Sequence, residues 1–210
     1  MDKIKNQFLD KLIPEIEKSG FKWNKSKSTF YRTTKTGWHS FIVIFKDYPD
    51  GYEVYVSIGI RNDKVENIFH LTSGFEVKYQ KYTPTIGVFI SEYETTKNHR
   101  YQLHLPDDIP VVVNNLIDDY SGIADKYYKD FDDVIVMDKL LNDSPAQYCV
   151  HKPAMPLKAQ TGLILAKLSG RKNYVEVEKI YKSILEEMDD GFYLQYFNPL
   201  SINLKQQNYK

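Results

Sequence analysis

The sequence has 210 residues, 42% of them hydrophobic and 27% charged, with 28 basic and 28 acidic side chains that cancel to a net charge of zero. These values are ordinary for a folded protein and exclude global disorder, collagen-like repeats and low-complexity classes. A chain of this length buries roughly 70% of the surface that its unfolded form exposes, so it can form a core without disulfides.

Cys149 is the single cysteine, so no disulfide can form within the chain, and a disulfide-rich secreted scaffold is excluded. The N-terminal residues lack the continuous apolar stretch of a signal peptide, and no segment approaches the roughly 18 apolar residues of a membrane-spanning helix. We therefore expect a cytoplasmic protein with no membrane partner.

The beginning of the chain predicts a helix followed by strands. Apolar residues recur every three or four positions over residues 4–16, which indicates an amphipathic helix that ends at Ser19-Gly20 and that Pro14 kinks or splits. Residues 29–34 and 38–45 are typical of strands, and the near-continuous apolar run of the second predicts burial on both of its faces.

The next segment predicts a hairpin. Residues 48–51 suit a type I turn, and residues 52–60 then alternate between apolar and polar, which predicts a strand with one buried face. We expect 38–45 and 52–60 to pair at the centre of the sheet. The apolar face of the second strand consists of Val54, Val56, Ile58 and Ile60. We also expect a short helix over residues 63–71 and strands over 75–82, 86–93 and 101–105, the last of which pairs with 86–93.

Helical periodicity returns after Pro106. Apolar residues step by three or four over residues 109–131, and Asp107 and Asp108 precede them, where acidic side chains interact favourably with a helix dipole. Residues 133–141 fit either a helix or a strand. The C-terminal region predicts an αα-hairpin and an aromatic-rich tail, over residues 157–168, 173–188 and 192–204.

These elements predict an α+β fold: an N-terminal helix, a mainly antiparallel sheet and C-terminal helices that include an αα-hairpin. We expect a sheet domain over residues 1–145 and a helical C-terminal region over residues 146–210 that packs on it to form one compact unit.

The zero net charge hides an acidic block. Residues 107–143 hold ten Asp or Glu and three Lys or Arg, a net charge of −7. Asp118, Asp119 and Asp125 avoid the apolar stripe of the predicted helix, so we expect all three to face solvent. They form either a solvated helix face or a partner-binding surface that attracts a basic protein. Tyr55, on the polar face of a predicted strand, is a further candidate for partner binding.

The N-terminal residues 1–46 are basic, with ten Lys or Arg and four Asp or Glu. Their basic residues lie near Trp23 and Trp38, and basic and aromatic residues together can bind single-stranded nucleic acid. The isoelectric point of the chain is about 7.0, however, below the range above roughly 9 that is typical of nucleic-acid-binding domains. We therefore do not expect a nucleic-acid partner.

The common catalytic and cofactor motifs are missing from the sequence. It contains no glycine-rich phosphate loop, no zinc or calcium motif and no serine-hydrolase elbow, so we assign no catalytic residue, metal ligand or cofactor. Cys149 and His151 are two residues apart and fit either a nucleophile and its base or a buried core pair.

One short pattern resembles an enzyme signature. Pro49-Asp50 followed by Glu76-Val77-Lys78 is similar to the motif of metal-dependent nucleases, in which two carboxylates hold Mg²⁺ and the lysine supports the attacking water. The same residues also have local explanations, because Pro49-Asp50-Gly51 suits a turn and Glu76 and Lys78 suit the polar face of a strand.

The order of features resembles a bacterial domain family of unknown function. The likeness lies in Gly20-Phe21-Lys22 after the first helix, Phe30-Tyr31-Arg32 on a strand, and the helical segment from Asn115 to Tyr120, and it spans about residues 4–140. Members of such families resemble small accessory or immunity proteins encoded beside bacterial toxins. The resemblance implies a protein partner and no catalytic residue.

We therefore expect a non-enzymatic protein-interaction module, in the specific form of an immunity-type inhibitor of a bacterial toxin. Two alternatives stay open. One is a metal-dependent nuclease or phosphodiesterase that uses Asp50, Glu76 and Lys78. The other is a small-ligand-binding module on a Tyr-lined sheet face, which requires a concave pocket with a few convergent polar groups.

Overall fold

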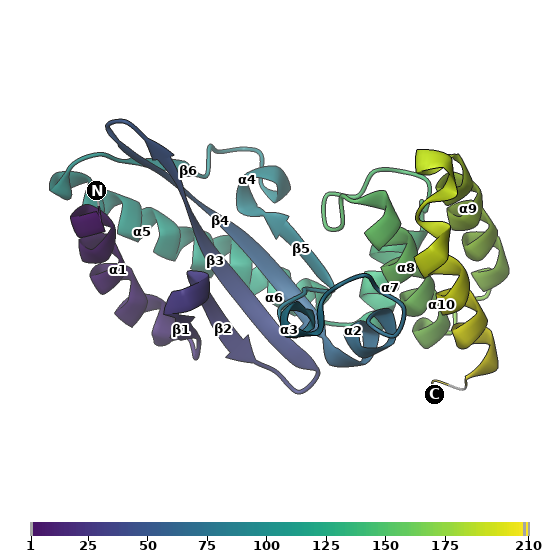
Figure 1. The fold of residues 1–210 in the computed structure, drawn as a ribbon. Helices are drawn as coiled ribbons and strands as arrows, with labels where there is room; N and C mark the ends of the chain where they lie inside the picture. Colours follow the sequence, from purple (N-terminus) through teal and green to yellow (C-terminus); the bar gives the residue numbers. More distant parts are fainter. Residues whose placement is uncertain (1, 208, 210) are drawn as a thin grey trace. The chain divides into compact units, whose positions relative to one another are not determined.

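The structure, a computed structural model, describes residues 2–207 and Tyr209. It has the predicted α+β fold, with an N-terminal helix, an antiparallel sheet and C-terminal helices (Figure 1). The chain divides into two compact units, one of Met1–Ile60 with Gly87–Asp130 and one of Arg61–Ile86 with Phe131–Lys210. This division differs from the predicted boundary at residue 145, because two helices that precede this boundary contact a C-terminal helix.

The first unit holds the sheet, whose strands follow the order β1-β2-β3-β4-β5, with β6 paired to β4. Tyr52 pairs with Leu103 and Tyr55 with Arg100, so β6 runs antiparallel to the first part of β4. The strands are β1 (Lys22–Asn24), β2 (Thr29–Thr33), β3 (Gly37–Tyr48), β4 (Gly51–Asn62), β5 (Ile86–Phe89) and β6 (Arg100–Leu103). The predicted hairpin of residues 38–45 and 52–60 is confirmed as β3 and β4.

Two strand predictions in this region are wrong in part. The predicted strand over 86–93 ends at Phe89, because its second half forms the short helix α4 (Ile90–Tyr93). Residues 101–105 were expected to pair with it, but β6 pairs with β4 instead. The short β5 leaves the first part of β4 available to β6.

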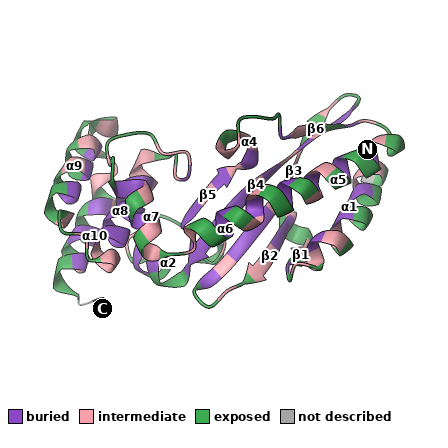
Figure 2. Ribbon diagram, turned by 180° about the vertical axis from the view of Figure 1, so that it is seen from behind, coloured by how far each residue is buried: buried purple, intermediate pink, exposed green. Residues whose placement is uncertain are grey.

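Helices cover one face of this sheet. Figure 2 shows α1 (Asp2–Glu17), α5 (Ile109–Asp119) and α6 (Asp125–Phe131) in front of the strands, and a π-helical turn over residues 120–124 joins the last two. The predicted core face of β4 is confirmed, since Val54, Val56, Ile58 and Ile60 are all buried. The prediction that β3 is buried on both faces is wrong, because Ile42 and Ile44 on its other face are only half-buried.

The second unit is helical. Its αα-hairpin is confirmed as α8 and α9, and α8 is followed by Gly170, whose positive φ of 71° is typical of the residue that ends a helix. Residues 133–141 form a helix, which Asp133 caps by accepting hydrogen bonds from the amides of Ile135 and Val136. The helices are α2 (Asp63–Phe69), α3 (Val77–Gln80), α7 (Val134–Asn142), α8 (Met155–Ser169), α9 (Tyr174–Glu187) and α10 (Leu194–Gln206).

The predicted strand over residues 75–82 is wrong. This segment holds the single-turn helix α3, and the side chain of Val77 is 82% exposed. Alternating apolar residues form a strand only where a neighbouring strand pairs with them. The place beside β4 in the sheet is already taken by β5, so residues 75–82 do not pair there.

Within the described residues, no helix is both long and apolar enough to cross a membrane.

Candidate functional site

The three aspartates predicted to share an exposed helix face have different surroundings. Asp118 is exposed, as predicted. Asp125 is half-buried, and its carboxylate lies 2.6 Å from Nζ of Lys129 and 3.9 Å from Nη2 of Arg32. Asp119 is only 4% exposed, so the prediction that it faces solvent is wrong. The three aspartates therefore do not share one exposed helix face.

Asp119 is buried because β6 and the residue before it cover a second side of α5. The carboxylate of Asp119 lies 2.7 Å from Nδ1 of His99 and accepts a 2.9 Å hydrogen bond from the hydroxyl of Tyr101. Burial raises the pKa of Asp119, and the hydrogen bonds from His99 and Tyr101 oppose that rise. The apolar stripe of the helix gave no sign of this second contact.

Tyr55 lies on the sheet face opposite the helices, where it is half-buried. Its ring is 4.6 Å from the guanidinium of Arg100 and 5.8 Å from the ring of Phe89. Arg100 in turn forms a 3.1 Å ion pair with Glu53. Tyr55 is thus held by neighbours within the sheet.

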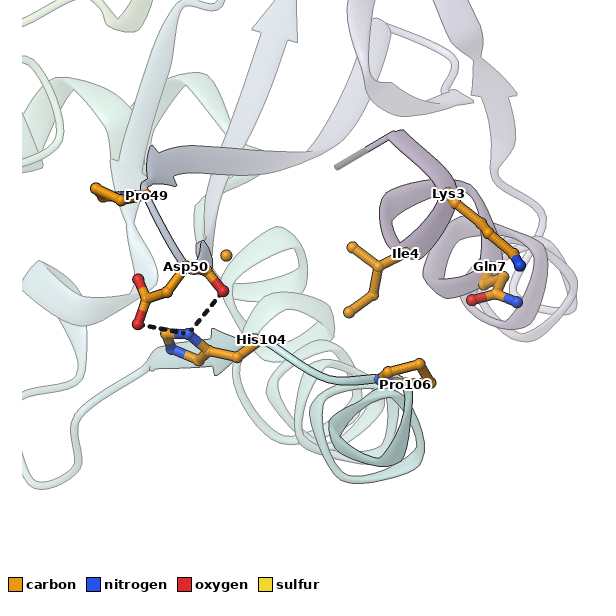
Figure 3. Close-up of a pocket in the computed structure, with 8 residues that line it drawn as sticks. Lys3, Ile4, Gln7, Pro49, Asp50, His104 and Pro106 are labelled. Atoms are coloured by element: carbon orange, nitrogen blue, oxygen red, sulfur yellow. Dashed lines mark hydrogen bonds and ion pairs between the residues drawn. The ribbon is translucent and has the colours of Figure 1, made fainter.

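The residues of the nuclease-like pattern have separate local partners. Asp50 lies beside a pocket of about 440 Å³ next to α1, where Nδ1 of His104 is 3.2 Å from both its carboxylate and its carbonyl oxygen (Figure 3). Glu76 and Lys78 belong to the other unit and form an exposed ion pair of 2.8 Å. Over the described residues, no group of three His, Cys, Asp or Glu could hold a metal ion. The structure therefore gives the nuclease alternative no support.

A second pocket, of about 360 Å³, lies within the helical unit, and five of its eleven lining residues are aromatic. We call it the aromatic pocket. Its rings come from two separate parts of the sequence: the end of α2 with the loop that follows it, and the segment that leads into α10. They are Phe69, Phe75, Phe192, Tyr193 and Tyr196.

The local sequence explains how these rings meet. Gly74 lies against Tyr196, and a Cβ atom at this position would be 3.1 Å from the Tyr196 hydroxyl oxygen, so a larger residue would push the tyrosine away. The rings of Phe69 and Phe75 lie 6.0 Å apart, and those of Phe192 and Tyr196 lie 6.3 Å apart. These are ordinary distances for interacting aromatic pairs.

Gln160 of α8 supplies one polar group to the pocket wall. Its side chain is 4% exposed, and its Nε2 donates a 3.0 Å hydrogen bond to the carbonyl oxygen of Pro156. That bond fixes the orientation of the amide, because a flipped amide would place two oxygens against each other. Its Oε1 is buried and has no hydrogen-bond partner among the described residues. Buried polar atoms are rarely left in this state.

Ser73 supplies the second polar group, and a chain of hydrogen bonds sets its orientation. The Thr83 hydroxyl lies 2.6 Å from a carboxylate oxygen of Glu66 and 2.9 Å from the carbonyl oxygen of Gln80, both of which only accept. The Thr83 oxygen must therefore accept the 2.8 Å hydrogen bond from Nε2 of His70. In the neutral imidazole this leaves Nδ1 of His70 unprotonated, so that it accepts the 2.8 Å hydrogen bond from the Ser73 hydroxyl.

The proton of the Ser73 hydroxyl is thus engaged with the imidazole of His70, and Oε1 of Gln160 is enclosed behind the pocket wall. Burial lowers the pKa of His70, although nearby Glu66 raises it, and a lowered pKa favours the neutral imidazole that this chain requires. Sequence reasoning missed the site. Ser73 and Phe75 fell in or beside a segment predicted as a strand, and Gln160 was one polar residue in an apolar helix.

The comparisons with known proteins add no relative. No family model, curated protein or solved structure matches this chain.

Proposed function

We propose that this protein is a protein-interaction module and that the aromatic pocket receives an aromatic side chain of its partner. The observation that carries the proposal is the exposure of the rings at the pocket rim. Phe75 is 38% exposed and Phe192 is 55% exposed. Buried aromatic anchors in fitted pockets supply much of the binding energy of protein interfaces.

Exposed apolar residues continue along the chain on both sides of Phe75, which favours a protein partner over a small ligand. Leu71, Val77 and Tyr79 lie on the same chain segment as Phe75, and all three are exposed. Exposed apolar residues gathered on one segment are expected at interaction sites, whereas single scattered ones are ordinary. A small ligand would fill the pocket and leave these residues in water.

Charge plays a small part at this surface. Glu76 and Lys78 lie between the exposed apolar residues, and their 2.8 Å ion pair cancels their charges. Long-range steering needs a net field, so we expect association here to depend little on salt. This behaviour separates the aromatic pocket from the acidic-face hypothesis, in which salt would slow association with a basic partner.

The resemblance to families encoded beside bacterial toxins makes a toxin the first partner to test. An immunity-type inhibitor needs a surface that binds its target, and the aromatic pocket with its exposed rim provides one. A toxin gene beside the gene for this chain would supply the candidate partner.

The proposal can be tested without a known partner by selecting displayed peptides on the full chain. We expect the selected peptides to share an aromatic residue, and their affinity to fall at least tenfold in the double variant Phe75→Ala/Phe192→Ala, as for loss of interface anchors. The matched control is Val175→Ala/Ile202→Ala, which removes exposed apolar side chains that do not line the pocket. Peptides without an aromatic residue, or equal affinity for both double variants, would reject the pocket as the binding site.

A further inference from the structure

We propose that the groove between α1 and α5 in the first unit binds an amphipathic helix of a partner protein, one with an apolar stripe and basic residues beside it. This surface goes beyond the proposed function, because the groove and the aromatic pocket lie in different units. The shape of the groove, the apolar side chains beside it and the charges around it carry the proposal.

The groove is formed by two helices that pack side by side (Figure 2). It has a volume of about 820 Å³, and its floor on α5 holds Ile109, Val113 and Ile117, four residues apart. Side chains at this spacing lie on one face of a helix, and these three span about 12 Å, just over two turns. A groove of this kind accepts a third helix, whose side chains enter it every three or four residues.

The groove has an apolar floor and a polar rim. Ile109 and Val113 keep 8% and 6% of their surface exposed, and Ile117 is half-buried, so all three still reach the groove. At the rim, Gln7 of α1 and Asn114 of α5 are exposed. An apolar centre with a polar rim is the usual arrangement of a protein interface.

Two large apolar side chains beside the groove are held in water. Leu105 is 63% exposed and Val111 is 60% exposed, and they are the exposed large apolar residues among the described residues of the first unit. Each is the chain neighbour of a proline that lines the groove. The amides of His104 and Leu105 both donate 2.8 Å hydrogen bonds to the carboxylate of Asp108. The backbone that carries Leu105 is therefore fixed before a partner binds, which lowers the entropy that binding must remove.

The α5 side of the groove is acidic. Residues 101–125, which include α5, contain five Asp and no Lys or Arg. Of these aspartates, Asp107 and Asp118 are exposed, near the two ends of the helix. Basic residues of a partner would be attracted to this side, because no basic side chain of the same segment neutralises it.

The α1 side carries charges of both signs, with acidic groups in excess among the lining residues. Asp10 and Glu15 line the groove with Lys11, and Glu15 also lies 2.6 Å from Nζ of Lys18. Pro14 has no N–H, so α1 cannot supply the usual helical hydrogen bond to the carbonyl oxygen of Asp10. This oxygen lies on the exposed side that Asp10 shares with Pro14, and it adds an acceptor for a lysine or arginine of the partner.

The test uses two synthetic helical peptides that are titrated into the full chain and followed by NMR. Both carry leucines every three or four residues; one has lysines beside the leucine stripe, and the other has glutamates in place of the lysines. We expect the lysine peptide to bind about tenfold more tightly in about 10 mM salt, and the difference to shrink in about 1 M salt, which screens exposed charges. The resonances that shift should belong to α1 and α5. This comparison needs no variant, so misfolding cannot obscure it.

A charge-reversal variant then assigns the preference to the groove. Asp10→Lys/Glu15→Lys makes the α1 side basic and should remove the preference for the lysine peptide. The matched control, Glu186→Lys/Glu187→Lys, makes the same change in net charge at two exposed positions of α9 and should keep the preference. Circular dichroism establishes that both variants are folded.

An apolar variant tests the contacts beside the groove. Leu105→Ser/Val111→Ser should weaken the binding of both peptides about tenfold, as for loss of interface anchors. The matched control, Val175→Ser/Ile202→Ser, removes exposed apolar side chains of the other unit and should leave both affinities unchanged.

Several results would overturn the proposal. Equal binding of the two peptides, or a lysine preference that survives Asp10→Lys/Glu15→Lys, would reject the basic partner. Shifts outside α1 and α5, or no binding at millimolar concentration, would reject the groove as the site. Shifts of these helices that depend on protein concentration without any peptide would identify a second copy of this chain as the occupant. None of these results bears on the aromatic pocket, whose rings lie in the other unit.

Discussion

A Cβ atom on Gly162 of α8 would lie 2.6 Å from the hydroxyl oxygen of Tyr181 on α9. The same hydroxyl is 2.8 Å from Oδ1 of Asn142, the last residue of α7, and the Asn142 side chain donates a 2.8 Å hydrogen bond back to the carbonyl oxygen of Gly162. Three helices thus meet at one glycine, through polar atoms that are all buried.

Gly162→Ala is expected to destabilise the protein. Alanine favours a helix over glycine by about 1 kcal/mol, but the added methyl group must displace Tyr181 or Asn142, and overpacking of this kind costs about 1–3 kcal/mol. Chemical denaturation measures the difference. The control is Gly122→Ala, where a Cβ atom would meet nothing within 4 Å, so that no loss is expected. Equal stability of Gly162→Ala and wild type would show that the helices can move apart without cost.

Neighbouring aspartates should differ widely in their contribution to stability. Asp119→Ala leaves His99 and Tyr101 without their shared acceptor in a buried place, which should cost about 3 kcal/mol. Asp118→Ala removes an exposed charge and should change stability by less than about 1 kcal/mol. The urea midpoints of the two variants give the comparison. Similar midpoints would mean that the His99–Asp119 contact does not hold β6 against α5.

The core face of β4 should be sensitive to truncation. Val56 and Ile58 are both fully buried, so replacing either by alanine should lower the free energy of unfolding by about 1–4 kcal/mol. Ser57 lies between them on the other face, and Ser57→Ala removes one hydrogen bond of 3.3 Å, so it should cost less. A larger loss of stability for Ser57→Ala than for Val56→Ala and Ile58→Ala would show that the core lies on the other face of β4.

Stability should fall in mild acid because of His151. Burial lowers the pKa of His151 to about 4 in the folded protein, whereas an unfolded histidine has a pKa of about 6.5. Between these two values the unfolded chain binds a proton that the folded chain does not, so the free energy of unfolding decreases as the pH falls from about 6.5 to about 4. Below about pH 4 both states are protonated and this contribution stops changing.

The measurement for this prediction is the unfolding midpoint at several pH values, for wild type and for His151→Gln. The variant should lose less stability than wild type over that pH interval, because carboxylates that titrate there do so in both proteins. If the midpoints of wild type and His151→Gln fall in parallel as the pH is lowered, the loss of stability in acid comes from groups other than His151.

The elements that the sequence predicted well are those whose periodicity and end signals agree. The alternation over β4 and the glycine after α8 each specify an element from local residues alone. The misreading of residues 75–82 shows the converse, since an alternating pattern needs a neighbouring strand to pair with. The burial of Asp119 depends on β6, a segment predicted as a strand but expected to pair with residues 86–93 and not with β4.

The aromatic pocket could not be predicted from local patterns for a related reason. Its walls combine the loop at Ser73–Phe75, the side chain of Gln160 and the start of α10 near Phe192. Each segment has an ordinary local explanation, as a turn, a helix and an aromatic tail. The pocket itself exists only when all of these segments are in place.

The division into two units means that the chain passes from one unit to the other after Ile60, after Ile86 and after Asp130. Helix α2 therefore leaves the ribosome long before α8, the helix that it packs against. At roughly 5–20 residues per second, its apolar side waits several seconds for that contact. During synthesis, Val65, Ile68 and Phe69 stay uncovered until α8 has been made, and a chaperone or rapid elongation would protect them from wrong contacts in that time.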